Sequence, residues 1–341
     1  MVTADGRDIR ALAYPSLTGT PRPGDRVLLN TTAGDLGLGT GGYAFVVALP
    51  DRLPDDEPLP GHIMKARYTP LQTAVASADE QGSPHHEALA DADSVDGMPV
   101  VAADLHSALP AVLAGFFSGT DLRGSPAPRA VYLMTDGGAL PGAFSMTVAR
   151  LREAGWLAGT VTAGQAFGGD LEAVTVHSGL LAARHVLGAD MVIVAQGPGN
   201  LGTGTRWGYS GVAAGEAVNA AAALGGRPVA SLRLSDADPR ERHQGISHHS
   251  LTAYGRVALA PADVAVPDLP GPFGERIAAE AAPLGTRHRL VTVDTAGLED
   301  ALAACPVRLS TMGRGLEQDR AYFLAAAAAG RHARALASGH A

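Results

Sequence analysis

The segment from Ala189 to Gly226 constrains the fold of this chain more than any other. It begins with the apolar run Met191 to Ala195, continues through a loop dense in glycine, and ends in a run of small residues typical of a helix. Because the apolar run is continuous and does not alternate with polar residues, it predicts a parallel strand covered on both faces. From Met98 onward, strand and helix signals alternate, which is typical of βαβ units around a parallel sheet.

The sequence therefore predicts an α/β protein with a small second domain. Residues 98–341 are expected to form a Rossmann-like, three-layer fold with a parallel or mostly parallel sheet. Residues 1–76 consist of short apolar runs between Pro and Gly turns, which predicts a small β-rich, barrel-like domain. The acidic, small-residue segment 77–97 predicts a linker. Two local predictions are a helix over 171–187, capped by Asp170, and a strand over 256–260.

Composition excludes several classes of function. The formal net charge is −8, and no basic run interleaved with aromatic residues occurs; nonspecific nucleic-acid binding, which depends on clustered Lys and Arg, is therefore not expected. Cys305 is the single cysteine, which rules out an intrachain disulfide and fits a reducing cytoplasm. No stretch approaches the ~20 apolar residues of a membrane span. We expect a soluble, cytoplasmic protein.

Polar side chains follow several of the predicted parallel strands, and the carboxyl ends of such strands meet at one edge of the sheet. This geometry predicts a site that binds a small metabolite there, with acid/base groups or a divalent metal. The candidate catalytic residues are Asp104, His106, Asp136 and His177. The candidate metal ligands are Asp104, His106, Asp136, Asp236 and His248. Carboxylate and imidazole ligands suit Zn²⁺, Mn²⁺ or Fe²⁺.

Two observations leave these assignments open. No H-E-x-x-H or other diagnostic ligand spacing is present, and His177 falls near the apolar stripe of its predicted helix, where a hydrogen-bonded core histidine is the alternative. The polar segment 236–250 contains three histidines, at 243, 248 and 249, and His249, like His177, could also help to complete a metal's ligand shell. Segments of this length between regular elements are usually functional or mobile.

The glycine loop after the strand at 191–195 predicts an anion cradle, because glycine lets backbone N–H groups approach a bound anion. The candidate cofactor- or anion-binding residues are Gly197, Gly199, Asn200, Gly202, Thr203, Gly204, Thr205 and Arg206. The alternative is an irregular connection in a chain that holds 43 glycines. The match to G-x-G-x-x-G over 197–202 does not favour NAD. The helix starts late, and the nearest acid at a following strand end, Asp236, lies well beyond the usual spacing of about 20 residues.

Three strings of the sequence are distinctive: ALAYPSLTGTPRPGDRVLLNTTAGDLGLGTGGYAFVVALP, KARYTPLQ and GPGNLGTGTRWGYSG. Together they resemble an uncharacterised bacterial family, domain-of-unknown-function family 3866, which is common in high-GC actinobacteria. The resemblance covers nearly the whole chain and implies no activity, cofactor or catalytic residue. Relatives extend further at the N-terminus, so the first β-rich domain is expected to be incomplete in this chain.

The leading hypothesis is an enzyme, or an enzyme-like binder, of a small anionic metabolite at the carboxyl edge of the sheet, with metal-assisted hydrolysis as its chemistry. The alternative is a noncatalytic structural or regulatory module that forms homo-oligomers through its Ala- and Gly-rich helices. The two differ in one observable: the enzyme needs a concave polar site beside the glycine loop, whereas the module needs an exposed apolar patch.

Overall fold

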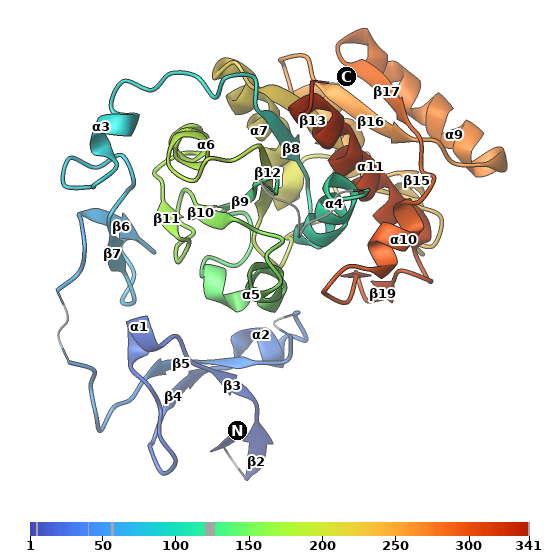
Figure 1. The fold of residues 1–341 in the computed structure, drawn as a ribbon. Helices are drawn as coiled ribbons and strands as arrows, with labels where there is room; N and C mark the ends of the chain where they lie inside the picture. The colour runs from blue at the N-terminus through green and yellow to red at the C-terminus, as the bar shows by residue number, and fades with distance from the viewer. Residues whose placement is uncertain (5, 40, 56–57, 120–126, 340–341) are drawn as a thin grey trace. The chain divides into compact units, whose positions relative to one another are not determined.

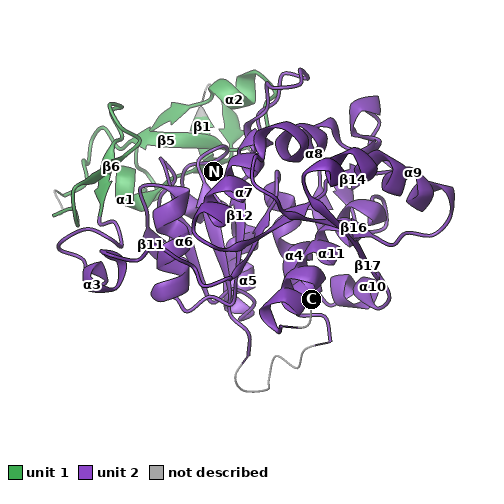
Figure 2. Cartoon of the chain, turned by 90° about the horizontal axis from the view of Figure 1, so that it is seen from above, with its two compact units in different colours: residues 1–75 green, residues 76–341 purple. Residues whose placement is uncertain are grey.

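The computed structural model describes residues 1–341 except 5, 40, 56–57, 120–126 and 340–341 (Figure 1). The chain divides into two compact units, Met1–Val75 and Ala76–Ala341 (Figure 2). Within the described residues, none of the helices has both the length and the apolar character that a transmembrane span requires.

Unit 1 is β-rich. Its elements are β1 (Val2–Ala4), β2 (Arg7–Ile9), β3 (Ala11–Leu12), α1 (Pro15–Thr18), β4 (Leu28–Asn30), α2 (Thr32–Asp35), β5 (Ala44–Ala48), β6 (Ile63–Lys65) and β7 (Thr73–Val75). The strands pair in three separate sheets, β1-β2, β3-β5-β4 and β6-β7. These strands are two to five residues long, and among the described residues they do not close into a barrel.

Unit 2 is built around one eight-stranded sheet. Its strands are β8 (Pro99–Ala102), β9 (Ala130–Thr135), β10 (Gly159–Thr162), β11 (Leu171–Glu172), β12 (Met191–Gln196), β13 (Arg227–Ser231), β16 (Asp263–Pro267) and β17 (Arg289–Val293). The spatial order is β11-β10-β9-β12-β8-β13-β16-β17, and every neighbouring pair is parallel. All six residues of β12 are buried, so the apolar run that predicted a strand covered on both faces is confirmed.

Helices cover both faces of this sheet, which makes unit 2 a three-layer α/β structure. The longer helices are α4 (Leu109–Phe116), α5 (Met146–Glu153), α6 (Val176–His185), α7 (Ala213–Ala223), α9 (Gly271–Ala281), α10 (Leu298–Ala303) and α11 (Arg320–Ala337). Helices α4, α5, α10 and most of α11 share one apolar core with Val101, whereas α6, α7 and α9 share the other with Val100 and Ala102. Successive strand side chains thus point to opposite layers.

Short elements fill the connections of unit 2. They are α3 (His86–Leu89), β14 (Leu234–Ser235), β15 (Gly245–Ile246), α8 (His248–Thr252), β18 (Ser310–Thr311) and β19 (Arg314–Gly315), and a 3₁₀ turn spans Glu241–His243. β14 pairs with β15 and β18 pairs with β19, both antiparallel.

The strand order creates a switch point at the centre of the sheet. The chain leaves β8 toward β9, β10 and β11, returns to insert β12 between β8 and β9, and then crosses to β13 on the far side of β8. Helix α4, which follows β8, and helix α7, which follows β12, lie on opposite faces. Connections that diverge in this way open a crevice at the carboxyl ends of the strands.

The Ala-rich helices are buried inside the chain. Residues 325–329 of α11 are at most 1% exposed, and α11 crosses α4 at very short range. A Cβ at Gly115 would lie 1.8 Å from the backbone oxygen of Ala327, and one at Gly330 would lie 1.8 Å from that of Val112. Glycine is required at this crossing because any side chain would force the helices apart. The Ala-rich face of α11, which motivated the homo-oligomer alternative, therefore packs against α4 of the same chain.

Three local predictions differ from the structure. The span 171–187 contains the short strand β11 before α6, and the helix is capped by Thr175, whose side chain accepts from Ser178 N–H. Residues 253–257 form a π-helical turn, and the strand lies later, at β16. Segment 77–97, for which the sequence predicts a linker, packs within unit 2: Val95 is fully buried, and Ser77 forms a β-bridge with Glu172 of β11.

Candidate metal centre

Two buried charges meet at the carboxyl ends of β8 and β13. Asp104 follows β8 and is 3% exposed, and Arg233 follows β13 and is 5% exposed. The Nη1 atom of Arg233 lies 3.7 Å from Oδ2 of Asp104. Gln196, at the end of β12, donates a hydrogen bond of 2.7 Å from Nε2 to the backbone oxygen of Asp104. Each buried charge therefore depends on its neighbour for compensation.

Three histidines gather beside this pair. The antiparallel pairing of β14 with β15 folds the segment after β13 back on itself, so that His243 in the 3₁₀ turn meets His248 and His249 at the start of α8. One ligand nitrogen from each ring lies within 4.8 Å of the others. His243 is 2% exposed and His249 is 5% exposed, while His248 is half-buried. Three imidazoles are the protein ligands of one class of catalytic zinc site.

Neighbouring side chains hold these rings. Ser247 caps α8: its Oγ accepts from the backbone N–H of His249 and is 2.7 Å from Nδ1 of His243. This bond leaves Nε2 of His243 free for a ligand. The ring of Tyr209 stacks on His249 with centroids 3.7 Å apart, and its hydroxyl donates to the backbone oxygen of His249 at 2.7 Å. The fold thus orders the rings in advance, which reduces the entropy lost when a ligand binds.

The imidazoles of His243 and His248 are uncharged at neutral pH. Burial, with the charges of Arg233 and Arg240, lowers the pKa of His243 to about 3. Burial, together with His249 and with the charge of Arg242, lowers the pKa of His248 to about 4. A neutral imidazole carries the lone pair that a metal ion requires. Metal binding near pH 7 would therefore release no proton from these two rings.

The buried polar atoms that lack a hydrogen-bond partner collect at this edge. Among the described residues they are Asp104 Oδ2, Gln196 Oε1 and His248 Nε2. Such atoms are uncommon in folded proteins and mark places where a water, an ion or a ligand binds. A cavity of about 10 Å³, lined in part by Asp104, Gln196 and Ser210, lies between β8 and β12, and this is about the space of one water.

A network of paired charges, formed by Asp238, Arg240, Arg314 and Asp319, lies next to the histidine cluster. Asp238 is 2.8 Å from Arg240 and 3.0 Å from Arg314, and Arg314 is also 2.8 Å from Asp319. Burial alone would raise the pKa of Asp238, but the hydrogen bonds and charge of Arg240, with the charge of Arg314, hold it well below its usual range. The buried carboxylates Asp104, Asp238 and Asp319 are thereby matched by the guanidinium groups of Arg233, Arg240 and Arg314.

Of the residues predicted from the sequence, Asp104 and His248 border this cluster. Oδ2 of Asp104 lies 3.5 Å from Nδ1 of His249. The structure does not bring three others to it. Asp136 is exposed and accepts a hydrogen bond from the backbone N–H of Gln165 at 2.8 Å. Asp236 is exposed, and so is His177, which lies away from the buried face of α6.

His106 has a structural environment. Its Nε2 is 2.8 Å from Oγ of Ser145, the residue that caps α5, and its Nδ1 is 3.1 Å from the hydroxyl of Tyr132. Burial lowers the pKa of His106 to about 4, so protonating the ring is unfavourable and it is a weak base. This histidine fixes the start of α5 and does not contribute to the cluster of three.

The glycine loop has two parts. Gly197 is buried, and a Cβ there would lie 2.4 Å from the backbone oxygen of Ala139, so this glycine allows two backbones to touch. Residues 201–210 then form a hairpin closed by bonds such as Thr203 N–H to the oxygen of Gly208 at 2.7 Å. Residues 201–207 of this hairpin are exposed, and Tyr209 at its end is buried. The remaining predicted loop residues, Gly199, Asn200, Gly202, Gly204, Thr205 and Arg206, are exposed or half-buried.

Sequence reasoning put His248 in the ligand set and named His249 only as a residue that could complete the shell, and it did not consider His243 as a ligand. The signal was present in the spacing H-x₄-H-H within the polar segment 236–250. Adjacent histidines rarely share a site within a regular element. Here the pair sits where an extended cap, Ser247, turns into α8, and the two rings stay 4.5 Å apart.

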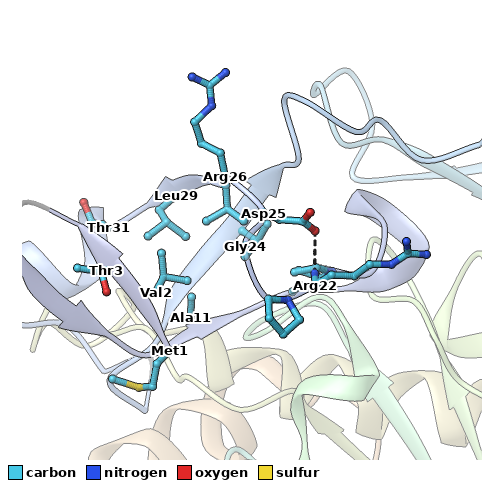
Figure 3. Close-up of a pocket in the computed structure, with 15 residues that line it drawn as sticks. Met1, Val2, Thr3, Ala11, Arg22, Gly24, Asp25, Arg26, Leu29 and Thr31 are labelled. Atoms are coloured by element: carbon cyan, nitrogen blue, oxygen red, sulfur yellow. Dashed lines mark hydrogen bonds between the residues drawn. The ribbon is translucent and has the colours of Figure 1, made fainter.

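A larger hollow, of about 860 Å³, lies in unit 1 between β1, β4 and the loop 21–27. Figure 3 shows the guanidinium group of Arg26 pointing away from the strands. Two of its charged side chains are paired with residues outside the lining: Asp25 with Arg52, and Arg26 with Asp51 at 2.7 Å. The lining holds no group of acid, base or metal-ligand side chains among the described residues, so volume alone does not make it the better candidate.

Comparison with known proteins places the chain in a family without assigning an activity. No match is found among curated proteins, and none among solved structures. One family matches residues 10–330, which is most of the chain. The protein therefore belongs to the family DUF3866, described as a protein of unknown function.

Proposed function

We propose that this chain binds a divalent transition-metal ion through His243, His248 and His249 and uses it to hydrolyse a small anionic metabolite. The observation that supports this most is the convergence of three imidazole nitrogens within 4.8 Å, together with the unpartnered, buried Nε2 of His248. A buried polar atom without a partner costs about 1–3 kcal/mol. A metal ion at this point would remove that cost.

Zinc fits the donor set best. Imidazole nitrogen is a ligand for Zn²⁺, Cu²⁺ and Fe²⁺, and three histidines plus a water is a common arrangement for catalytic zinc. Bonds of about 2.0–2.1 Å to zinc would draw the three nitrogens closer together, which rotation of the half-buried His248 ring allows. The metal would supply a hydroxide nucleophile by lowering the pKa of its bound water to about 7.

Asp104 has the position of a residue that orients a ligand. Arg233 Nη1 is 3.2 Å from Nδ1 of His249, and because arginine only donates, this nitrogen accepts in the metal-free protein. A metal ion on Nε2 of His249 would leave the ring proton on Nδ1. That N–H could then donate a hydrogen bond to Oδ2 of Asp104, which lies 3.5 Å away. Carboxylate–histidine–zinc arrangements of this kind fix the tautomer of the ligand and raise its basicity.

The experiment measures zinc binding to chelator-treated protein by competition with a chromophoric chelator. We expect one zinc ion per chain. His248→Ala should weaken binding by more than the roughly 10- to 100-fold that changes around metal ligands cause. His177→Ala is the matched control, since it removes an exposed histidine from the same unit, and it should leave zinc affinity unchanged. The proposal fails if wild-type protein takes up no stoichiometric zinc, manganese or iron, or if His248→Ala binds as tightly as wild type.

Asp104→Asn tests the orienting role. It should weaken zinc binding about 10- to 100-fold while the metal-free variant keeps a folded structure by circular dichroism. Zinc-loaded and chelated wild-type protein should then be compared on phosphate monoesters, phosphate diesters and carboxylic esters. Hydrolysis that appears with zinc and disappears with the chelator supports the proposed reaction, and equal rates in both samples contradict it.

A further inference from the structure

Arg242 is a free cation at the mouth of the histidine cluster. It directly precedes His243 in the 3₁₀ turn, but it is exposed whereas His243 is buried. Its positive charge reaches the ring of His248. Within the part of the chain that the structure describes, Arg242 makes no hydrogen bond and no ion pair, in contrast to Arg233 and Arg240, which are paired with carboxylates.

The tip of the glycine loop lies against this side chain. The position of a Cβ at Gly204 is 3.7 Å from the guanidinium carbon of Arg242, so the guanidinium group rests on the loop backbone. Gly204 has φ +80°, and Thr203 and Thr205 flank it with their hydroxyls 3.0 Å apart. The other end of the loop is held at Tyr209, which stacks on His249. Loop and histidine cluster therefore form one continuous surface.

The charges at this surface are not balanced once a metal is bound. The buried carboxylates of the network are already matched by buried or half-buried guanidinium groups. The three imidazoles are neutral ligands, so a divalent ion keeps its two positive charges, and Arg242 adds a third. Opposite charge is needed to compensate them, and a dianion supplies more of it than a carboxylate does.

We infer that Arg242, together with the loop tip around Gly204, binds a phosphoryl group next to the metal, so that the substrate of this site is a phosphate ester. The planar fork of a guanidinium group matches two oxygens of a phosphate, and backbone N–H groups and threonine hydroxyls near a glycine can donate to the others. This inference rests on the proposed function, because the metal provides part of the charge that the phosphoryl group neutralises.

The test titrates zinc-loaded full-length protein with inorganic phosphate and, separately, with acetate, by calorimetry. Arg242→Ala should weaken phosphate binding about tenfold or more, as loss of a charge-assisted contact does, and Arg242→Lys should fall between the two. Arg150→Ala, which removes an exposed arginine from α5, is the matched control and should bind like wild type. In a Trp156→Phe background Trp207 in the loop is the only tryptophan, so phosphate should change its fluorescence.

The outcomes separate this inference from the metal site. Zinc affinity of Arg242→Ala is measured in parallel and should not fall below that of wild type, because the variant removes a positive charge from beside the ion. If wild-type protein binds no zinc, the same phosphate titration on metal-free protein still tests the role of Arg242. Phosphate binding that is lost in Arg242→Ala supports the inference, and no phosphate binding by wild-type protein overturns it. Phosphate affinity within twofold of wild type in Arg242→Ala, or acetate binding as tight as phosphate, also overturns it.

Discussion

Two segments leave neighbouring parts of the sheet and differ in almost every respect. The loop 197–208 after β12 is rich in glycine, largely exposed, and hydrogen-bonded mainly to itself. The segment 232–250 after β13 is rich in charged and histidine side chains, many of them buried. Besides the hydrogen bonds within the segment, it bonds to distant parts of unit 2, as Ser235 does to Asp319 and Asp238 to Arg314. The first is conspicuous in the sequence, whereas the second contains most of the groups that can do chemistry.

The difference has a physical cause. Glycine allows backbone conformations that other residues avoid, so a glycine-rich loop indicates an unusual backbone conformation but does not specify a ligand. Buried Asp, Arg and His side chains are costly unless they are paired or bind something. A segment that keeps several of them, and leaves Nε2 of His248 without a partner, is the stronger indication of a function.

The largest expected effect separates two neighbouring acids in the second segment. Asp238→Ala removes the buried carboxylate that Arg240 and Arg314 share. It should destabilise the protein by about 3–5 kcal/mol, because the buried Arg233 and the half-buried Arg240 and Arg314 all lose a counter-charge. Asp236→Ala is the control, since Asp236 is exposed, and it should change the unfolding free energy by less than about 0.5 kcal/mol. Urea unfolding of both variants checks this. Similar losses in the two would mean that the buried network has no special role.

A smaller effect distinguishes the glycines of the loop from one another. Gly197→Ala would place a methyl group 2.4 Å from the oxygen of Ala139, so the backbones must separate, at a cost of about 1–3 kcal/mol. At Gly202 the nearest atom to a new Cβ is 3.8 Å away, and Gly202→Ala should be nearly neutral. Thermal unfolding of the pair measures the difference. If Gly202→Ala is the more damaging, the division of the loop into a packed base and a free tip is incorrect.

The smallest effect is the acid dependence of the second segment. The folded pKa of Asp238 is lower than its ordinary value, so its contribution is fully present above about pH 4, the unfolded pKa. It is lost as the pH falls from there toward the folded value. The stability difference between wild type and Asp238→Asn should therefore narrow below pH 4 and stay constant from pH 5 to 8. Guanidinium chloride unfolding at several pH values tests this, and a gap that widens on acidification would contradict the pairing.

The general fold was predictable, and its details were less so. Continuous apolar runs predicted buried parallel strands, and the run 191–195 lies in the fully buried strand β12. The strand expected at 256–260 was wrong: a π-helical turn over 253–257 occupies its start, and of its apolar residues Ala258 is buried while Leu259 is exposed. Periodicity over five residues does not distinguish these two conformations.

The candidate site was predictable only in part. The rule that ligands bind at the carboxyl ends of parallel strands pointed to Asp104, and the polar segment after β13 pointed to His248. Asp136 also follows a strand, yet its carboxylate caps the local turn at Gln165. The position of a residue at a strand end therefore predicts the edge of the sheet where the residue lies. The direction and the partner of its side chain depend on the neighbouring loops.

Most strands and helices of unit 2 can be located from the amino-acid sequence, because buried apolar side chains leave a recognisable pattern along the chain. The sequence does not indicate that β12 inserts between β8 and β9, that β14 and β15 fold the histidine segment back, or that Asp104 lies beside His249, 145 residues away. Such contacts depend on strand order, which no local pattern encodes. The grouping of the candidate site residues therefore depends on long-range packing, whereas the type of each secondary-structure element depends mainly on the local sequence.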